Sequence, residues 1–191
     1  VVGTLATTYH EPHLPSRHEL LAGELACSLV AIALERVASE AQLAHQALHD
    51  SLTGLPNRSL FVDGLDHALE RRNRTEAEIA VLFCDVDRFK VVNDSLGHSV
   101  GDELLVAFAE RLLGAVDPGD TVARFGGDEF VVLLEDVTDS ARPIDVAERI
   151  RASLEHPFPT AAGQDVYLTA SMGVAAASDH VSGDGWLRDA D

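Results

Sequence analysis

The sequence predicts an α/β fold of the α+β sandwich kind, in which helices flank a central mixed sheet. Helical and strand-like patterns alternate along residues 59–191. Residues 79–84 form an apolar run of the length expected for a buried strand. Residues 121–135 contain two adjacent glycines between apolar runs, which is the pattern of a β-hairpin. One sheet with helices packed against it accounts for all three observations.

The first part of the chain contains a strand-like piece at residues 1–9, a loop with two prolines at 10–17, and a helix from about 16 to 49. On this helix, apolar residues recur at alternating steps of three and four, as they do in a coiled coil. The apolar seam consists of Cys27, Val30, Leu34, Val37, Ala41, Ala44 and Leu48. A two-stranded parallel coiled coil and a single amphipathic helix packed on its own domain both fit this pattern. The alanines weaken the seam, which suits a linker that transmits a signal.

The later helices are expected where apolar residues recur on one face of a segment without proline. The later strands are expected where short apolar runs are bounded by turn residues. In chain order, the predicted elements are a helix at 59–73, the strand at 79–84, a helix at 101–116, the hairpin at 121–135, a helix at 144–154, a strand at 166–176 and a final helix at 184–191.

Length and composition favour a soluble module. The chain has 191 residues, enough for one domain of average size and an appendage. We find no apolar run long enough to cross a bilayer and no signal peptide, and we expect a cytoplasmic location. A net charge of −18 repels nucleic acids and anionic membranes, so we expect no nucleic-acid partner and no direct membrane contact. Cys27 and Cys84 lie in apolar contexts and are expected to be buried free thiols.

The hairpin carries two acidic residues directly after its glycines. Asp128 and Glu129 would lie at the rim of the sheet, beside a backbone without side chains. Asp85 follows the buried strand and could face the hairpin. Mg²⁺ prefers hard oxygen ligands and usually keeps water or substrate phosphates in its shell. These acids therefore form a candidate magnesium site, and an ordinary acidic surface hairpin is the alternative.

Three polar residues after the strand suit nucleotide recognition. Lys90 could neutralise a phosphate, whereas Asn93 and Asp102 could read the hydrogen-bonding edge of a base. Each residue also has a structural alternative, Lys90 as a solvated helix residue and the other two as helix caps.

Together, these motifs resemble the GGDEF domain of the diguanylate cyclase family. Five motifs occur in the family's order, at residues 50–58 (DSLTGLPNR), 85–94 (DVDRFKVVND), 97–102 (GHSVGD), 126–130 (GGDEF) and 168–175 (LTASMGVA). A shorter similarity links the N-terminal residues to the C-terminal end of a GAF sensory domain. The implied organisation is a GAF-like fragment at 1–17, a linker helix at 18–47 and a GGDEF domain at 48–191 that is truncated at its C-terminus.

The resemblance also implies a fold and a reaction. The fold is a five-stranded sheet with surrounding helices, akin to nucleotidyl cyclases and polymerase palm domains. The reaction joins two GTP molecules into cyclic di-GMP and releases two pyrophosphates. Mg²⁺ or Mn²⁺ would stabilise the attacking and leaving oxygens. Because each subunit holds one GTP, catalysis would require a homodimer.

The resemblance assigns roles by matched position. Asp85, the carbonyl of Val86, Asp128 and Glu129 would bind metal, and the last two would also be catalytic. The substrate-binding residues would be Phe89 and Lys90 at the phosphates, with Asn93 and Asp102 at guanine.

Two departures from the family pattern bear on activity. A product-binding inhibitory site would carry arginine at position 117 and aspartate at 120, but this chain has Asp117 and Asp120, so the site is expected to be degenerate. The family's final helix continues into a segment rich in Lys and Arg, before which this chain stops. The alternative function is therefore a GTP-binding regulatory module with weak or no turnover, upstream of a cyclic di-GMP phosphodiesterase domain.

Overall fold

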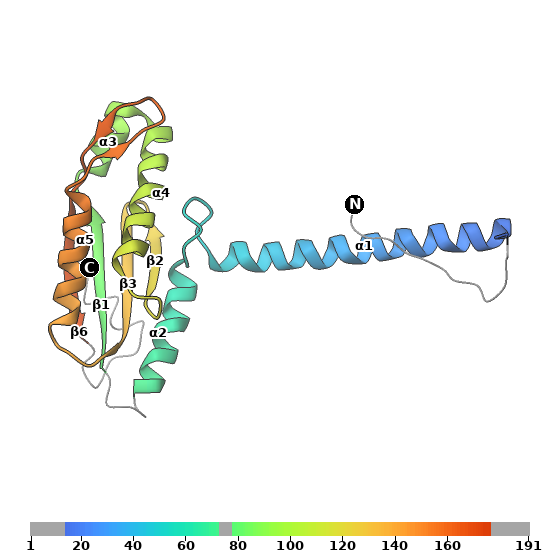
Figure 1. Ribbon diagram of the computed structural model, residues 1–191, viewed down its shortest axis with the longest axis horizontal. Coiled ribbons are helices and arrows are strands. Elements are labelled where there is room, and N and C mark those ends of the chain that lie inside the picture. The colour runs from blue at the N-terminus through green and yellow to red at the C-terminus, as the bar shows by residue number, and fades with distance from the viewer. Residues whose placement is uncertain (1–13, 73–77, 177–191) are drawn as a thin grey trace. The chain divides into compact units, whose positions relative to one another are not determined.

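The computed structural model describes residues 14–72 and 78–176, and the chain divides into two compact units at residues 1–47 and 48–191. The N-terminal unit contains one long helix, α1 (Arg17–Leu48) (Figure 1). Ser16 caps this helix, since the Glu19 amide donates to Ser16 Oγ and the Ser16 amide donates to Glu19 Oε2. This reciprocal arrangement is a capping box, and it explains why the helix begins after the proline loop.

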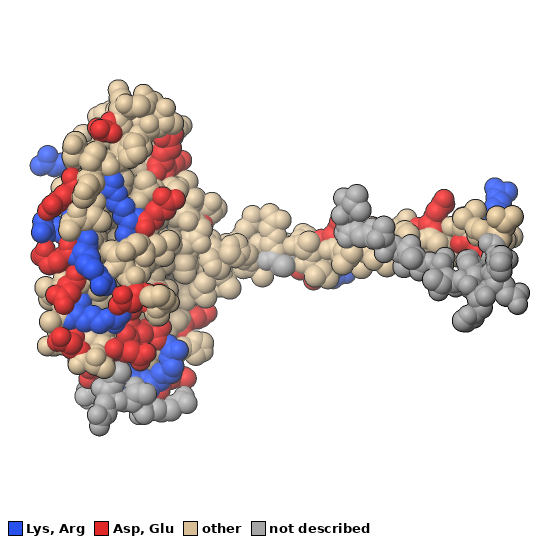
Figure 2. Space-filling view, viewed as in Figure 1, with Lys and Arg blue, Asp and Glu red and all other residues tan. Residues whose placement is uncertain are grey.

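The surface of α1 is largely apolar. Val30, Leu34 and Val37 of the expected seam are 50%, 44% and 64% exposed in the single chain. Much of the helix visible in Figure 2 carries neither acidic nor basic side chains. Cys27 is exposed rather than buried, which corrects the expectation for this thiol. The physical reason is that an apolar sequence context leads to burial only where a second element covers that side of the helix.

The second unit is built on a four-stranded sheet in the order β2-β3-β1-β6. The strands are β1 (Glu78–Val86), β2 (Thr121–Gly126), β3 (Glu129–Val137) and β6 (Ala170–Ala176). Each neighbouring pair of strands is antiparallel. The apolar run of β1 is the central feature, because β3 pairs with one of its edges and β6 with the other.

Helices cover both faces of this sheet, as Figure 1 shows. Alternate residues of each strand point to opposite faces, so each strand contributes side chains to two hydrophobic cores, one on each face of the sheet. The smaller core lies under α2 (Arg58–Arg72) and includes Phe61, Val81 and Val131. The larger core lies under α4 (His98–Ala115) and α5 (Arg142–Leu154).

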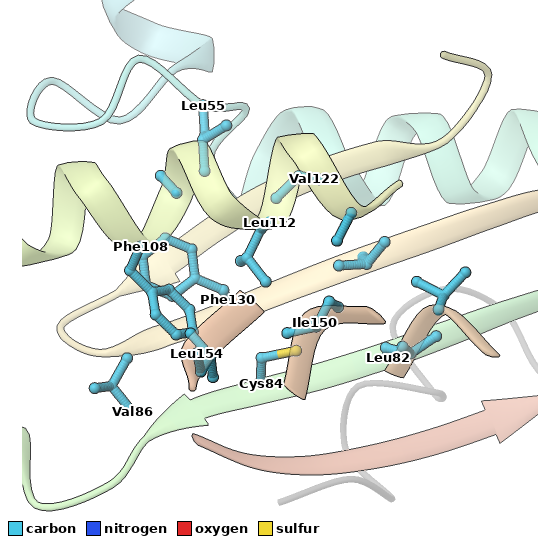
Figure 3. Close-up of a cluster of buried hydrophobic side chains, with 14 of the residues drawn as sticks. Leu55, Leu82, Cys84, Val86, Phe108, Leu112, Val122, Phe130, Ile150 and Leu154 are labelled. Atoms are coloured by element: carbon cyan, nitrogen blue, oxygen red, sulfur yellow. The ribbon is translucent and has the colours of Figure 1, made fainter. Parts of the chain in front are cut away.

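The larger core contains the residues labelled in Figure 3. Phe108 of α4 packs against Phe130 of β3 with ring centroids 5.0 Å apart. Cys84 of β1 is buried in the same cluster, as expected, and burial raises the pKa of its thiol to about 12. A thiol in this environment stays protonated at neutral pH and acts as a small apolar side chain.

The expected class of fold is confirmed, with differences in detail. Within the described residues the main sheet has four strands rather than five and is antiparallel rather than mixed. The expected strand at 166–176 is divided into β6 and the short β5 (Asp165–Val166), which pairs with β4 (Phe158–Pro159) in a separate ribbon. Proline in β4 cannot donate to a sheet ladder, which keeps this ribbon short.

A further helix, α3 (Phe89–Leu96), lies between β1 and α4 and was not expected as a separate element. The strand-like piece predicted at 1–9 and the helix predicted at 184–191 lie outside the described residues. No helix in the two described ranges has both the length and the apolar character needed to cross a bilayer.

Candidate functional site

The acidic residues of the hairpin meet the end of β1. Asp85 is the partner of Glu129 in the antiparallel ladder between β1 and β3. The amide of Val86 donates to the carbonyl of Asp128 at 3.2 Å. The turn has positive φ at Gly126 (143°) and Gly127 (52°), a conformation in which side chains are strained. The structure thus places the backbones of the four residues predicted as metal ligands side by side, although they come from two segments of the chain.

The electrostatics of this site favour a cation. Burial raises the pKa of Asp85, and the negative charges of Asp128 and Asp87 raise it further. These neighbouring carboxylates repel one another, and a bound divalent cation would relieve that repulsion.

The donors also fit Mg²⁺ or Mn²⁺, since both ions accept carboxylate and carbonyl oxygens. Among the described residues, no three His, Cys, Asp or Glu side chains converge as a ready-made metal centre. The Val86 carbonyl, water and substrate phosphates would have to complete the shell around Asp85 and Asp128.

A surface cavity adjoins these acids on the face of the sheet that carries α2. Asp85 and Glu129 line it together with Ser171, Phe125 and Arg58. The guanidinium of Arg58 lies 5.5 Å from the centroid of the Phe125 ring. Arg58 therefore brings positive charge to an acidic cavity, a position that the sequence analysis did not assign.

The residues predicted to read guanine lie at the junction of α3 and α4. Asn93 is inside α3 and the exposed Asp102 is inside α4, so neither is a helix cap. The side chain of Asn93 lies against Gly101, where a Cβ atom would come within 1.9 Å of Asn93 Oδ1. Asn93 Oδ1 is buried and has no hydrogen-bond partner among the residues that the structure describes. A buried acceptor without a partner is costly, and a donor from a bound base would satisfy it.

The residues predicted to contact phosphates begin α3. Phe89 is buried at 7% exposure, whereas Lys90 is exposed in the first turn. Arg88 precedes them in the left-handed conformation, with φ of 55° and ψ of 28°. The backbone therefore turns sharply between the acidic end of β1 and the N-terminus of α3, where amide groups and the helix dipole favour a negatively charged group.

Arg124 of β2 holds the turn of the hairpin by hydrogen bonds, a role that was not predicted from the sequence. Its side chain is 9% exposed and donates two hydrogen bonds to the Gly127 carbonyl, at 3.2 and 2.7 Å. It also donates to Asp50 Oδ1 at 2.8 Å. An arginine two residues before a Gly-Gly turn was the available signal, but its acidic partner could not be identified from the sequence.

The turn before β2 contains the two residues of the predicted degenerate inhibitory site. The side chain of Asp120 is 1% exposed and accepts hydrogen bonds from the Asp117 amide and from Arg142 Nη2. Asp117 forms ion pairs with Arg142 at 3.0 Å and with Arg149 at 3.7 Å. Both acids are therefore neutralised by arginines of α5, which the sequence analysis did not foresee.

Comparison with known proteins identifies the family. The model for "Diguanylate cyclase, GGDEF domain" matches residues 47–191. Diguanylate cyclase TpbB of Pseudomonas aeruginosa is 46% identical over 140 residues, which cover 73% of this chain and 32% of TpbB. The bifunctional diguanylate cyclase/cyclic di-GMP phosphodiesterase MucR of that species is 41% identical over 165 residues, covering 86% of this chain and 23% of MucR. The chain thus spans about a third or less of these curated relatives.

Solved structures agree with this result. The GGDEF domain of TpbB matches with a TM-score of 0.71 at 43% identity, covering 74% of this chain and 83% of that one. A structure of the coiled coil and GGDEF domain of DgcB from Caulobacter crescentus, in complex with c-di-GMP, matches with a TM-score of 0.75 at 28% identity, covering 89% and 91%. With its acids and glycines at the end of β1 and in the β2–β3 turn, the chain belongs to the GGDEF family of diguanylate cyclases.

Proposed function

We propose that this protein condenses two GTP molecules into cyclic di-GMP and pyrophosphate. The observation that carries the proposal is the meeting of Asp85 with the Asp128–Glu129 pair across the ladder between β1 and β3. Family membership gives the reaction class, and this juxtaposition indicates that the acids it requires are present in this chain.

Each acidic residue has a distinct part in the proposed reaction. Asp85, Asp128 and the Val86 carbonyl would hold Mg²⁺ or Mn²⁺ through oxygen atoms. Such an ion stabilises the attacking 3′-oxygen and the leaving pyrophosphate when it is bound. Glu129 faces Asp85 and would help to hold a second ion or accept the proton of the 3′-hydroxyl.

The substrate would extend from these acids to the junction of α3 and α4. Lys90 and the amides near Phe89 would contact the phosphates at the start of α3, where the helix dipole also favours negative charge. Asn93 and Asp102 would receive the guanine, whose ring N–H and amino groups are donors. The buried Asn93 Oδ1 supports this placement, since it needs a donor and has none within the described ranges 14–72 and 78–176.

Regulation would act through pairing of two chains. One GTP per subunit supplies half of the product, so two subunits must face each other for synthesis. The exposed apolar residues of α1 favour a coiled coil between subunits. The matched structure of DgcB includes a coiled coil, which supports this arrangement. We therefore propose a linker helix at 18–47 between a GAF-like region at 1–17 and the GGDEF domain at 48–191, in the cytoplasm where GTP is available.

A second candidate is a GTP-binding regulatory module with little or no turnover. Two relatives that are 39% identical favour it, because they are named cyclic di-GMP phosphodiesterases, NbdA of Pseudomonas aeruginosa and PdeR of Escherichia coli. In that case the site would bind GTP and Mg²⁺ but would not join two nucleotides, and its effect would be on a neighbouring phosphodiesterase domain.

Incubation of the full-length protein with GTP and Mg²⁺, followed by chromatographic separation of the nucleotides, tests the proposal. We expect cyclic di-GMP from the parent and at least about 100-fold less from Asp128→Asn and Glu129→Gln. The exposed Asp145 of α5 provides a matched control, and Asp145→Asn should retain parental turnover. Near-parental turnover in both acid variants would refute the assigned roles. A parent that binds a GTP analogue without making product would favour the second candidate.

A further inference from the structure

Asp87 lies two residues after Asp85, yet its side chain has different partners. Asp87 Oδ2 accepts a hydrogen bond from Thr169 Oγ1 at 2.5 Å, and Asp87 Oδ1 accepts one from Ser171 Oγ at 2.7 Å. The Asp87 amide donates to the Thr169 carbonyl at 2.9 Å. Three hydrogen bonds therefore join this residue to the start of β6, more than 80 positions later in the chain.

The spacing of the two hydroxyl residues explains how one carboxylate reaches both. Thr169 directly precedes β6 and Ser171 is its second residue, so their side chains point to the same face of the extended chain. In the ladder between β1 and β6, Ser171 is the partner of Asp85. The hydroxyl of Ser171 thus lies beside the proposed metal ligand but binds the carboxylate two residues further along the turn.

The segment that these hydrogen bonds fix is the turn that carries the proposed metal ligands. It contains Asp85 and Val86, and it continues through Arg88, whose φ of 55° is unfavourable for a residue with a side chain. Among the described residues, Asp85 lines both the cavity that contains Glu129 and a second cavity that contains Asp87 and Thr169, whereas Asp87 lines the second but not the first. Both oxygens of Asp87 accept short hydrogen bonds from residues at the start of β6, so its carboxylate is directed to that segment.

We propose that Asp87 is a positioning residue: it ties the turn between β1 and α3 to the start of β6, and this tie fixes the metal-binding carboxylate and carbonyl. The inference rests on the proposed function, because it concerns the metal site of that reaction. It assigns different work to the two aspartates of the Asp85-Val86-Asp87 motif, ligation to the first and orientation to the second. Groups that orient metal ligands affect metal affinity by about 10- to 100-fold.

Binding of Mn²⁺ to the full-length protein tests this assignment, measured by electron paramagnetic resonance in the presence of a non-hydrolysable GTP analogue. The variants are Asp87→Asn, the double variant Thr169→Val with Ser171→Ala, and the control Asp145→Asn. We expect the dissociation constant for Mn²⁺ to rise about 10- to 100-fold in Asp87→Asn and by a similar factor in the double variant. Asp145→Asn should bind like the parent, and thermal unfolding verifies that each variant is folded.

The outcomes separate the possible roles. Unchanged Mn²⁺ binding in Asp87→Asn, with a lower melting temperature, would make the residue structural and overturn the proposal. Weakened binding in Asp87→Asn with parental binding in the double variant would make Asp87 a ligand, which also overturns it. If the parent binds Mn²⁺ and the analogue but makes no cyclic di-GMP, the proposed function fails while the positioning role is still decided by the same titrations. A parent that binds no Mn²⁺ with the analogue contradicts both.

Discussion

Arg124 donates a hydrogen bond to Asp50 Oδ1 at 2.8 Å, although the two residues are 74 positions apart in the chain. The same guanidinium donates to the Gly127 carbonyl in the turn that precedes Glu129 and contains Asp128. Asp50 belongs to a loop that closes directly after α1, where the Asn57 amide donates to the Leu48 carbonyl. One buried arginine thus connects the loop after α1 to the hairpin of β2 and β3.

The first prediction concerns the pH dependence of this ion pair. Burial opposes ionisation of Asp50, but hydrogen bonds from Thr53 and Arg124 outweigh it and hold the pKa below its usual 3.8. Asp50→Asn should cost about 1.5–3 kcal/mol of unfolding free energy at pH 7. Because the folded pKa is depressed, the contribution of the carboxylate is complete above about pH 5, where the unfolded carboxyl is also ionised, and disappears as the pH falls through the folded pKa.

Urea unfolding at several pH values checks this prediction. The difference in unfolding free energy between parent and Asp50→Asn should be constant from pH 7 to about pH 5 and should shrink below pH 4. Asp63→Asn, at an exposed position of α2, is the control and should unfold like the parent. A difference that persists unchanged at the lowest pH would mean that the charge of Asp50 does not stabilise the fold.

A second prediction concerns the glycine beneath the proposed guanine site. A methyl group at Gly101 would displace Asn93, since an added Cβ atom would lie 1.9 Å from Asn93 Oδ1. We expect Gly101→Ala to weaken binding of a GTP analogue about 3- to 10-fold, corresponding to one impaired hydrogen bond. Isothermal titration calorimetry measures the effect.

Gly114 provides the control, because it lies in the same helix and no atom of the described part of the chain is within 4 Å of an added Cβ atom. Gly114→Ala should leave nucleotide binding unchanged and stabilise α4 by up to about 1 kcal/mol. Equal nucleotide affinity in both variants would show that Asn93 does not need its present position.

The third prediction is that cyclic di-GMP does not inhibit through the turn at residues 117–120. Asp117 places an acid where a phosphate-binding arginine would be needed, and Arg142 and Arg149 already pair with that acid. Micromolar cyclic di-GMP should therefore leave the initial rate of synthesis nearly unchanged. Strong inhibition together with product density at this turn in a crystal would contradict the prediction, whereas inhibition alone could arise by competition at the active site.

The fourth prediction concerns association through α1. Replacing Leu34 and Val37 with Asp would bury unpaired charge in a paired seam and cost several kcal/mol of dimer stability. The variant should sediment as a monomer and lose synthesis, while each subunit still binds a GTP analogue. In the parent, specific activity should rise with protein concentration, because a short seam with alanines gives reversible association.

Ser39 and Gln46 of α1 are the control positions, since they occupy the outermost positions of two successive heptads. Replacing both with Asp adds the same charge without entering the seam, and this variant should remain dimeric and active. If the Leu34/Val37 variant stays fully active at low concentration, α1 does not couple association to synthesis.

Much of this organisation could be predicted from the sequence, because it depends on local patterns. The apolar run before Asp85 and the glycines before Asp128 predict a buried strand and a hairpin, and the structure contains both. Contacts between distant segments could not be predicted in this way. The bond between Arg124 and Asp50 spans 74 positions and that between Asp87 and Thr169 spans 82.

Short elements were also difficult to predict. The helix α3 has only eight residues and starts after Arg88, a non-glycine residue with positive φ. Neither propensity nor periodicity over so short a segment identifies such a helix. The exposure of Cys27 is a similar case, because burial depends on which element covers a helix and the periodicity of a single chain does not contain that information.

The location of the bound metal tests the central claim most directly. Crystals of the protein with Mn²⁺ and a non-hydrolysable GTP analogue would give the metal position from its anomalous scattering. We predict one ion between the carboxylates of Asp85 and Asp128, with metal–oxygen distances of about 2.0–2.2 Å and the two carboxyl groups roughly 4–6 Å apart. An ion bound elsewhere, or these carboxylates directed to different faces with the nucleotide in place, would contradict the account.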